Sequence, residues 1–341
     1  MGRSIGDLGI FVGKRLLQLI PVLFGVIVLT FFFTHLNAGN ICNAWYPHAG
    51  AATIKNCEAT TSQPILTQFW QYLVNLLQGN WGQSQSGVLV YPYIAAALPA
   101  TVELVLAALF LMIFIGIPLG VIAAQYSGRL GDHLVRIFYL SGWATPTYLG
   151  AVIAAVFIGP AIGLPSRGEY STIAPPFPQY THMSVLDSLI AGNIPYTVDA
   201  LSHLILPATV LAFINMGIAT RMTRASMLEV LPLDYVRSAR MKGLTEFWVM
   251  YKHALRNALI TTTTVLGVTA GGLLSGTVVV EEVFSWPGIG QYAYTAIGGG
   301  GSVPNYAGAV AVVIIFAVAV VVANLIADIL YGVLDPRVDW R

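Results

Sequence analysis

The amino-acid sequence predicts an all-α integral membrane protein with six transmembrane helices and both termini in the cytoplasm. The first observation is composition. Of 341 residues, 56% are hydrophobic and only 9% are charged, whereas soluble domains carry roughly 25% charged residues. The second is the presence of six long apolar runs, and the third is the distribution of basic residues between them. The formal net charge of +1 excludes a strongly basic nucleic-acid-binding protein.

Six runs without Asp, Glu, Lys or Arg provide the expected spans. Each is close to the ~20 residues that cross the hydrocarbon core of a bilayer as a helix. Proline within such a run, as at Pro21, Pro118 and Pro146, predicts a kink. The expected spans are Leu16–Thr34, Leu104–Ala124, Ile137–Ile162, His203–Thr220, Asn257–Val280 and Tyr306–Ala327.

A seventh apolar stretch, Ile65–Leu77, is interrupted by polar amides such as Gln68 and Asn75. Its apolar residues recur at helical spacing, which is typical of an amphipathic helix. We therefore expect it to lie on the membrane or on the protein, without crossing the membrane.

Basic residues set the expected orientation. With six spans, 14 of the 16 Lys and Arg residues fall on the side of the termini, and only Lys55 and Arg167 fall on the other side. Because cytoplasmic loops carry the excess of positive charge, both termini are expected in the cytoplasm. The first apolar run is not followed by a small-residue cleavage site, so we expect it to remain as a span.

The chain is expected to divide into four parts around a membrane core. Three outer segments, 35–99, 163–202 and 281–305, hold most of the loop mass. In the third, Phe284 and Trp286 favour an interface, so this segment either dips back toward the membrane or forms an ordinary surface loop. The parts are the N-terminal tail with the first span (1–34), the outer segment (35–99), the five-helix core (100–333) and the cytoplasmic tail (334–341).

One substantial segment, 229–256, lies on the inner side. Asp234 is a candidate cap for a short helix, Tyr235–Lys242, which stops at Gly243. Thr245 is a candidate cap for a second helix that runs into the fifth span. The sequence thus predicts a helix–glycine–helix element joined rigidly to membrane helices.

Catalytic and metal-binding patterns are missing from the sequence. Only Glu103 and Asp328 are expected as acidic residues near or within spans, and the six histidines do not pair at metal-ligand spacing. No phosphate-binding Gly-x-x-x-x-Gly-Lys-Ser/Thr loop occurs. The nearly charge-free spans argue against proton coupling, although backbone carbonyls alone can hold sodium. We expect the energy source on a partner, not on this chain.

The inner segment contains Asp234-Tyr-Val-Arg-Ser-Ala-Arg-Met-Lys-Gly-Leu and then His253-Ala-Leu-Arg-Asn. These stretches resemble the signature loop of one family, the binding-protein-dependent ABC importer permeases, in the branch for dipeptides, oligopeptides and nickel, although the usual Glu and final Pro are missing. Residues 41–63 do not match and look like an insertion. Similar too are Arg15-Leu-Leu-Gln-Leu-Ile-Pro, Leu98-Pro-Ala-Thr-Val-Glu, Glu282-Val-Phe-Ser-Trp-Pro-Gly-Ile-Gly and Asp328-Ile-Leu-Tyr-Gly-Val-Leu-Asp-Pro-Arg.

This resemblance implies a type I ABC importer permease fold in the plasma or inner membrane, most similar to the first permease subunit of a dipeptide-type importer. It implies no cofactor on this chain, with ATP and Mg on partner ATPase subunits. The implied partners are a homologous second permease, two ATPase subunits, an extracytoplasmic substrate-binding protein and the lipid bilayer, with no nucleic acid. The residues implied in ATPase coupling are Tyr235, Ala239, Lys242, Gly243, Leu244 and Glu246.

Other features keep two interpretations. Gly267, Gly271, Gly272 and Gly276 form overlapping Gly-x-x-x-Gly pairs, which serve close helix packing or line a translocation path. Glu103 is either a path carboxylate or a hydrogen-bonded residue near a helix start.

Cys42 and Cys57 fall on the oxidising side, where a disulfide is permitted, although two unpaired thiols are the alternative. For the whole chain, the alternative functions are a stand-alone secondary transporter or channel and, less favoured, a membrane-embedded enzyme.

Overall fold

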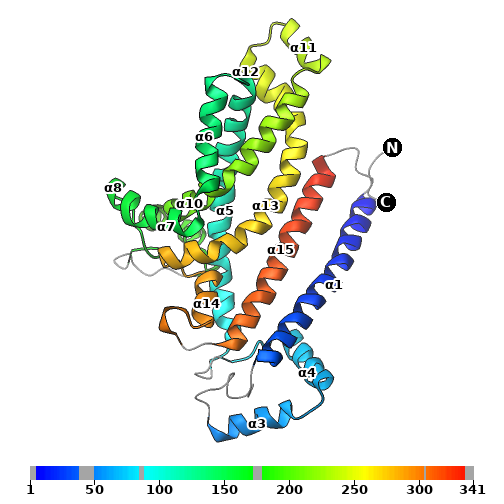
Figure 1. The fold of residues 1–341 in the computed structure, drawn as a ribbon, viewed down its shortest axis with the longest axis vertical. Coiled ribbons are helices and arrows are strands. Elements are labelled where there is room, and N and C mark those ends of the chain that lie inside the picture. Colours follow the sequence, from blue (N-terminus) through cyan, green and yellow to red (C-terminus); the bar gives the residue numbers. More distant parts are fainter. Residues whose placement is uncertain (1–4, 38–49, 84–87, 172–178, 303–304, 335–341) are drawn as a thin grey trace.

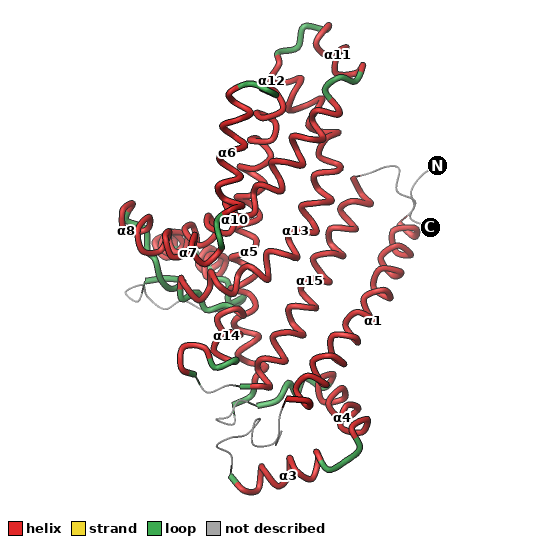
Figure 2. The backbone as a smooth tube through the Cα atoms, viewed as in Figure 1, coloured by secondary structure: helices red, strands yellow, loops and turns green. Residues whose placement is uncertain are grey.

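In the computed structural model, residues 5–37, 50–83, 88–171, 179–302 and 305–334 are described, and their backbone is almost wholly helical (Figures 1 and 2). The long helices are α1 (Ile5–Asn37), α5 (Val90–Gln125), α6 (Leu130–Ala144), α10 (Ile194–Val230), α13 (Leu255–Phe284) and α15 (Tyr306–Leu334). The shorter ones are α3 (Ala51–Thr61), α4 (Ile65–Leu77), α7 (Thr147–Ile153), α8 (Gly159–Ile162), α9 (Ser184–Ile190), α11 (Asp234–Met241), α12 (Glu246–Trp248) and α14 (Ile289–Ala296). Two π-helical segments, Ala154–Ile158 and Val249–Ala254, and a 3₁₀ turn at Gly299–Gly301 complete the elements.

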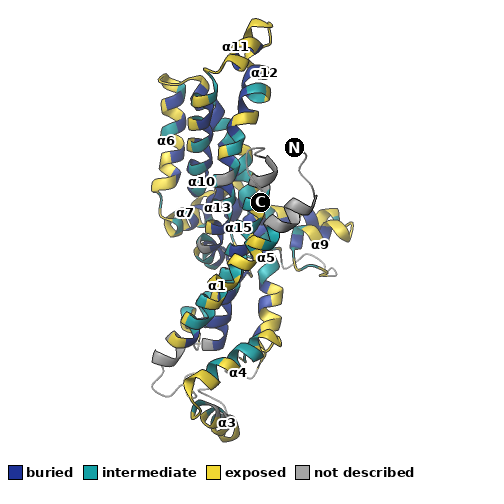
Figure 3. Ribbon diagram, turned by 90° about the vertical axis from the view of Figure 1, so that its right-hand side faces the viewer, coloured by how far each residue is buried: buried dark blue, intermediate teal, exposed yellow. Residues whose placement is uncertain are grey.

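The centre of the bundle is formed by α5, α10 and α13, where buried residues concentrate (Figure 3). Small residues let α5 and α10 approach closely. A Cβ atom added to Gly120 would lie 2.6 Å from Cβ of Thr223, and one added to Gly116 would lie 3.0 Å from Cβ of Ala219. This is the small-residue packing that membrane helices use.

Four described helices are long and apolar enough to cross a membrane alone: Val12–Phe32, Val90–Gln125, Ile194–Val230 and Ala307–Ile329. Two further candidates are bent pairs, Leu130–Ala144 with Thr147–Ile162, and Glu246–Thr263 with Val265–Leu274. The described chain therefore has at least four spans, and six if each bent pair crosses once.

The span expected as one helix at 137–162 is broken. α6 ends at Ala144, α7 begins at Thr147, and the two parts meet at 102°. Proline has no N–H and forces the preceding residue out of the helical region, and Thr145 indeed has ψ 120°. The kink predicted at Pro146 is confirmed, but it is far sharper than a continuous span allows. Pro21 and Pro118 lie inside uninterrupted helices.

The two ends of the bundle differ. α11 and α12 project from one end, and the first turns of α1 and the last turns of α15 lie toward it, whereas α3, α4 and α14 lie toward the other (Figure 1). The described ends of α1 and α15 thus lie toward the end of the bundle that carries α11. We call the end with α11 the inner end and the opposite one the outer end, as the positive charges predict.

The amphipathic helix has the predicted bounds, since α4 runs from Ile65 to Leu77. It packs on α1 through aromatic rings: the centroid of Phe69 lies 5.2 Å from that of Phe31 and 5.9 Å from that of Phe24. Of the two expected positions, on the membrane or on the protein, the structure thus shows contact with the protein. Leu66 and Leu77 on the same helix remain exposed.

Candidate functional site

The inner element has the predicted helix–glycine–helix form. α11 ends at Met241, and Gly243 has φ +76°, a left-handed conformation that glycine adopts without strain. The chain then re-enters a helix at Glu246 and continues without a break through the π-helical segment into α13. Thr245 occupies the N-cap position of α12 without a side-chain capping hydrogen bond, whereas Asp234 is the first residue of α11 and Leu233 occupies the N-cap position.

The base of this element is packed inside the chain. Val236 and Ala239 of α11 are 0% and 5% exposed, and they join a buried cluster with Val121 of α5, Met227 of α10 and Met250 of the π-helical segment. The small size of Ala239 therefore serves packing within this chain. A part of Ala239 in ATPase coupling, as the resemblance implies, stays a proposal, and within this chain its side chain is covered.

The face of this inner element that points away from the bundle exposes apolar side chains that no other described residue covers. An ion pair between Arg240 and Glu246, with Nη2 and Oε1 2.8 Å apart, joins α11 to α12 at its edge. Lys242 is exposed beside it. We call the exposed apolar group the apolar tip; it consists of Leu233 (47% exposed), Tyr235 (37%), Met241 (81%), Leu244 (40%), Phe247 (62%) and Trp248 (53%).

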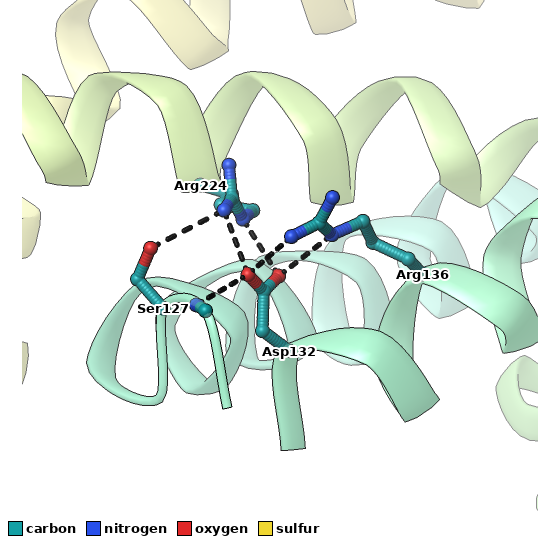
Figure 4. A network of polar contacts seen from close by, with 5 residues as sticks. Ser127, Asp132, Arg136 and Arg224 are labelled. Atoms are coloured by element: carbon teal, nitrogen blue, oxygen red, sulfur yellow. Dashed lines mark hydrogen bonds and ion pairs between the residues drawn. The ribbon is translucent and has the colours of Figure 1, made fainter. Parts of the chain in front are cut away.

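A buried carboxylate fastens α6 to α10 near the inner end (Figure 4). The side chain of Asp132 is 0% exposed. It accepts bonds from Arg136 Nη2 at 2.6 Å and from Arg224 Nη2 at 2.8 Å, and from the backbone N–H of Gly128 at 3.0 Å. Arg224 also donates to Ser127 Oγ. The turn between α5 and α6 is thereby tied to α10, the helix that leads into α11.

The glycines predicted on the fifth span divide between two environments. A Cβ on Gly267 would overlap Ala327 of α15, and Gly271 is buried near Val320 and Asn324 of the same helix. A Cβ added to Gly276 would lie 3.8 Å from Cδ2 of Leu211 of α10.

In contrast, Gly272 is exposed, with no atom within 4 Å of its Cβ direction. Close contact with α15 is observed at Gly267 and Gly271, and for all four glycines the packing and path interpretations both stay proposals.

Glu103 is 8% exposed and accepts hydrogen bonds from the backbone N–H groups of Ser184 (3.0 Å) and Val185 (2.9 Å) at the start of α9. The hydrogen-bonded interpretation is the one that this geometry supports. Asp328, the other acidic residue expected near a span, lies 3.2 Å from Arg15 of α1. Cys57 lies in α3, whereas Cys42 lies outside the described residues, so their disulfide stays a prediction.

The expectation that Glu103 and Asp328 are the only acids near spans is wrong. α13 extends to Phe284 and therefore includes Glu281, which is 0% exposed. Its carboxylate accepts from Thr101 Oγ1 at 2.7 Å and from the N–H of Gln291 at 3.1 Å. It thereby ties α14 to α5, and α14 packs back against the bundle with Ile289 and Ala296 buried. The signal in the sequence is the pair of acids directly before Val-Phe-Ser-Trp-Pro-Gly.

Comparison with known proteins agrees with this architecture. The family described as "Binding-protein-dependent transport system inner membrane component" matches residues 116–340. The chain belongs to this family. It is thus a permease, a multi-pass membrane component of an ABC-type importer.

Curated relatives of the permease match along nearly its whole length. The probable D,D-dipeptide transport system permease protein DdpB of Escherichia coli (strain K12) is 38% identical, over 95% of this chain and 96% of the relative. The di/tripeptide transport system permease protein DppB of Pseudomonas aeruginosa (strain UCBPP-PA14) is 38% identical, over 96% and 98%. A solved structure of the inward-facing MetNI methionine ABC transporter has TM-score 0.52 at 16% identity, covering 69% of this chain and 93% of that one. That last similarity supports the type I importer fold alone.

Proposed function

We propose that this permease forms half of the translocation pathway of an ATP-driven importer for di- or oligopeptides, and that the apolar tip is the surface through which ATPase subunits drive it. The family membership supports the transport role, and the names of the relatives support the peptide class. The observation that carries the coupling role is the combination of an exposed apolar tip with a buried, rigid base.

The mechanical argument begins at the base. α11 follows α10 after a short turn, and its buried face packs on the ends of α5 and α13 through Val236 and Ala239. A force on the apolar tip is therefore delivered to three long helices together. A flexible loop would absorb that motion, whereas packed interiors transmit strain.

The chemistry of the apolar tip also fits a docking role. Contiguous exposed apolar groups on a membrane protein's water-facing end mark an interaction site, because water would otherwise hydrate them at a cost in free energy. We infer that two ATPase subunits bind at the inner ends of this chain and of a homologous second permease. An extracytoplasmic binding protein delivers substrate to the outer end. ATP and Mg bind to the ATPase subunits, and the termini are cytoplasmic.

A substitution in the apolar tip tests this proposal. Met241 is 81% exposed, so Met241→Glu leaves the fold of the permease intact. A carboxylate desolvated at the docking surface without a partner costs several kcal/mol. We expect normal insertion of the variant, weaker co-purification of the ATPase subunits, and loss of ATP-dependent peptide uptake into proteoliposomes.

The matched control is Met241→Leu, which keeps an apolar side chain at the same position and is expected to transport normally. If Met241→Glu assembles and transports as the unmodified permease does, the apolar tip is not the coupling surface. If peptide uptake by the intact importer is undetectable while another solute is transported, the peptide assignment falls and the coupling role stands.

A further inference from the structure

A cavity of about 410 Å³ lies near the outer end, at the far side of the bundle from the apolar tip. Its walls come from three parts of the chain: α5, the connection between α8 and α9, and α14. Tyr93 and Ala97 represent the first wall, Glu169 and His182 the second, and Tyr292 the third. The coupling role proposed for the apolar tip involves none of these residues.

The cavity has an acidic character. Among its described lining residues there is one carboxylate, that of Glu169, and neither Lys nor Arg. The nearby carboxylate of Asp187 is fully buried and accepts from the backbone N–H groups of Thr181 and His182, and Glu103 is bonded to the start of α9. Burial raises the pKa of the Glu169 carboxyl above its ordinary value. The ionised form is thus held at a cost that a bound cation would offset.

Aromatic rings add a second attraction for a cation. The rings of Tyr93 and Tyr292 stack with centroids 6.0 Å apart and an interplanar angle of 7°. Both residues, together with Tyr170, line the cavity. Aromatic faces attract organic cations through the ring quadrupole, most strongly where water is partly excluded. The amide side chains of Gln179 and Gln291 line the same space and have the donors and acceptors that a peptide group needs.

The walls are held in place by bonds that do not involve a ligand. Ser184 Oγ donates to Glu169, which orients the carboxylate. On the opposite wall, Glu281 fixes the start of α14, and Trp286 Nε1 donates to the carbonyl of Ala100 at 2.9 Å. A binding site whose groups are already positioned loses less entropy when a ligand arrives.

We propose that this cavity binds the α-ammonium group of a peptide as it enters the permease, with Glu169 as the charged acceptor and Tyr93 and Tyr292 as aromatic walls. The inference rests on the proposed peptide class and adds a selection step at the outer end. A peptide with a blocked amino terminus lacks the charge and two of the hydrogen-bond donors, so it would be rejected at this site.

The test uses the assembled importer purified without its binding protein, so that only the membrane complex can bind the probe. The probes are alanyl-alaninamide, which carries one ammonium group, and N-acetyl-alanyl-alaninamide, which is neutral. Their binding is measured by saturation-transfer NMR. We expect the ammonium probe to bind at least about ten-fold more tightly, as charge-assisted hydrogen bonds imply.

Three variants locate the effect. Glu169→Gln should weaken binding of the ammonium probe by about ten-fold or more and leave the neutral probe unchanged. Glu58→Gln, at an exposed position in α3, is the matched control and should bind as the unmodified complex does. Ser184→Ala removes the bond that orients Glu169 but keeps its charge, so it should weaken binding of the ammonium probe by less than Glu169→Gln does.

Equal binding of the two probes, no binding of either, or unchanged binding by Glu169→Gln would each overturn the proposal. A loss in Ser184→Ala as large as that in Glu169→Gln would also overturn it, because the effect would then come from loop structure and not from charge. Peptide uptake by the unmodified importer is measured in parallel. Uptake without probe binding removes this inference alone, whereas absence of uptake removes the proposed function.

Discussion

The two ends of the permease differ in which side chains they bury and which they expose. At the inner end, short turns join α10, α11 and α12, and α12 continues without a break into α13. Six apolar side chains of the apolar tip are left exposed there. At the outer end, irregular connections are tied down by carboxylates that face inward. Glu281 is 0% exposed, Glu103 is 8% exposed, and both accept hydrogen bonds from backbone N–H groups.

The difference follows from where backbone N–H groups find partners. Inside a helix they bond to carbonyls four residues earlier, but the first turn of each helix leaves donors without partners. The outer end has two short helices, α9 and α14, that start inside packed structure, and Glu103 and Glu281 satisfy these donors. Among the described residues, these donors of the outer end are therefore satisfied within this chain. In the proposed function, the apolar tip of the inner end is instead covered by a partner.

The largest loss of stability is expected from substitution of Glu281, a buried carboxylate of the outer end. Glu281→Ala leaves Thr101 Oγ1 and the N–H of Gln291 without an acceptor in a buried place, at about 3 kcal/mol. We expect a lower melting temperature of the detergent-solubilised permease and release of α14 to proteolysis. Glu282→Ala, at the neighbouring half-buried position, is the control and should melt normally. A normal melting temperature for Glu281→Ala would show that the outer end does not depend on this carboxylate.

A smaller loss is expected at the carboxylate of the inner end. Asp132→Ala removes the acceptor shared by Arg136 and Arg224, but these arginines are 38% and 21% exposed and regain water. Solvent screening therefore limits the loss to about 2 kcal/mol, between the values for surface and buried ion pairs. The same melting measurement checks this, with the exposed neighbour His133→Ala as control. A loss larger than that of Glu281→Ala would reverse the comparison of the two ends.

Much of the inner end was predictable from the sequence because its signals are local. Gly243 at a positive φ, the start of α12 after Thr245 and the run of helix into α13 depend on neighbouring residues only. The bounds of α4 were predictable for the same reason, since periodicity over 13 residues sets them.

The outer end was harder to predict because its contacts join distant parts of the chain. The bond between Thr101 and Glu281 spans 180 residues, and that between Glu103 and Val185 spans 82. No spacing rule in a single sequence reports such pairs. The inward orientation of Ala239 was likewise invisible, because a small residue is equally consistent with docking on a partner and with packing in its own chain.

A substitution at Gly243 is expected to perturb only the turn between α11 and α12. Gly243 has φ +76° with no atom within 4 Å of its Cβ direction, so Gly243→Val meets backbone strain without a clash. The strain is about 1–2 kcal/mol, which re-orients α11 relative to α12 while the spans stay folded. We expect loss of ATP-dependent uptake at normal membrane levels. Gly243→Asn, which tolerates a left-handed conformation better, should retain more uptake than valine, and equal activity of both variants would exclude conformation as the cause.

Ala239→Asp is expected to act differently from a change in the apolar tip. The side chain is 5% exposed within its own chain, so an unpaired carboxylate there would be buried among apolar groups in the permease itself. We expect poor accumulation in the membrane, measured by immunoblot, before any effect on ATPase binding. Normal levels with selective loss of the ATPase subunits would instead place Ala239 at the interface.

The smallest effect is expected at the ion pair beside that turn. Arg240 and Glu246 are 41% and 44% exposed, and pairs of this kind contribute roughly 0.5 kcal/mol or less. Arg240→Gln should therefore leave the melting temperature unchanged and uptake within about two-fold of normal. Arg237→Gln is the control on the same helix. The effect of Arg240→Gln is expected to be small because the backbone at Gly243 and the buried contacts of Val236 already hold α11 in position. If Arg240→Gln abolished uptake while the control transported normally, the ion pair would be the device that sets the angle between α11 and α12. The position of the apolar tip would then depend on side-chain charge, as the turn between α5 and α6 does through Asp132.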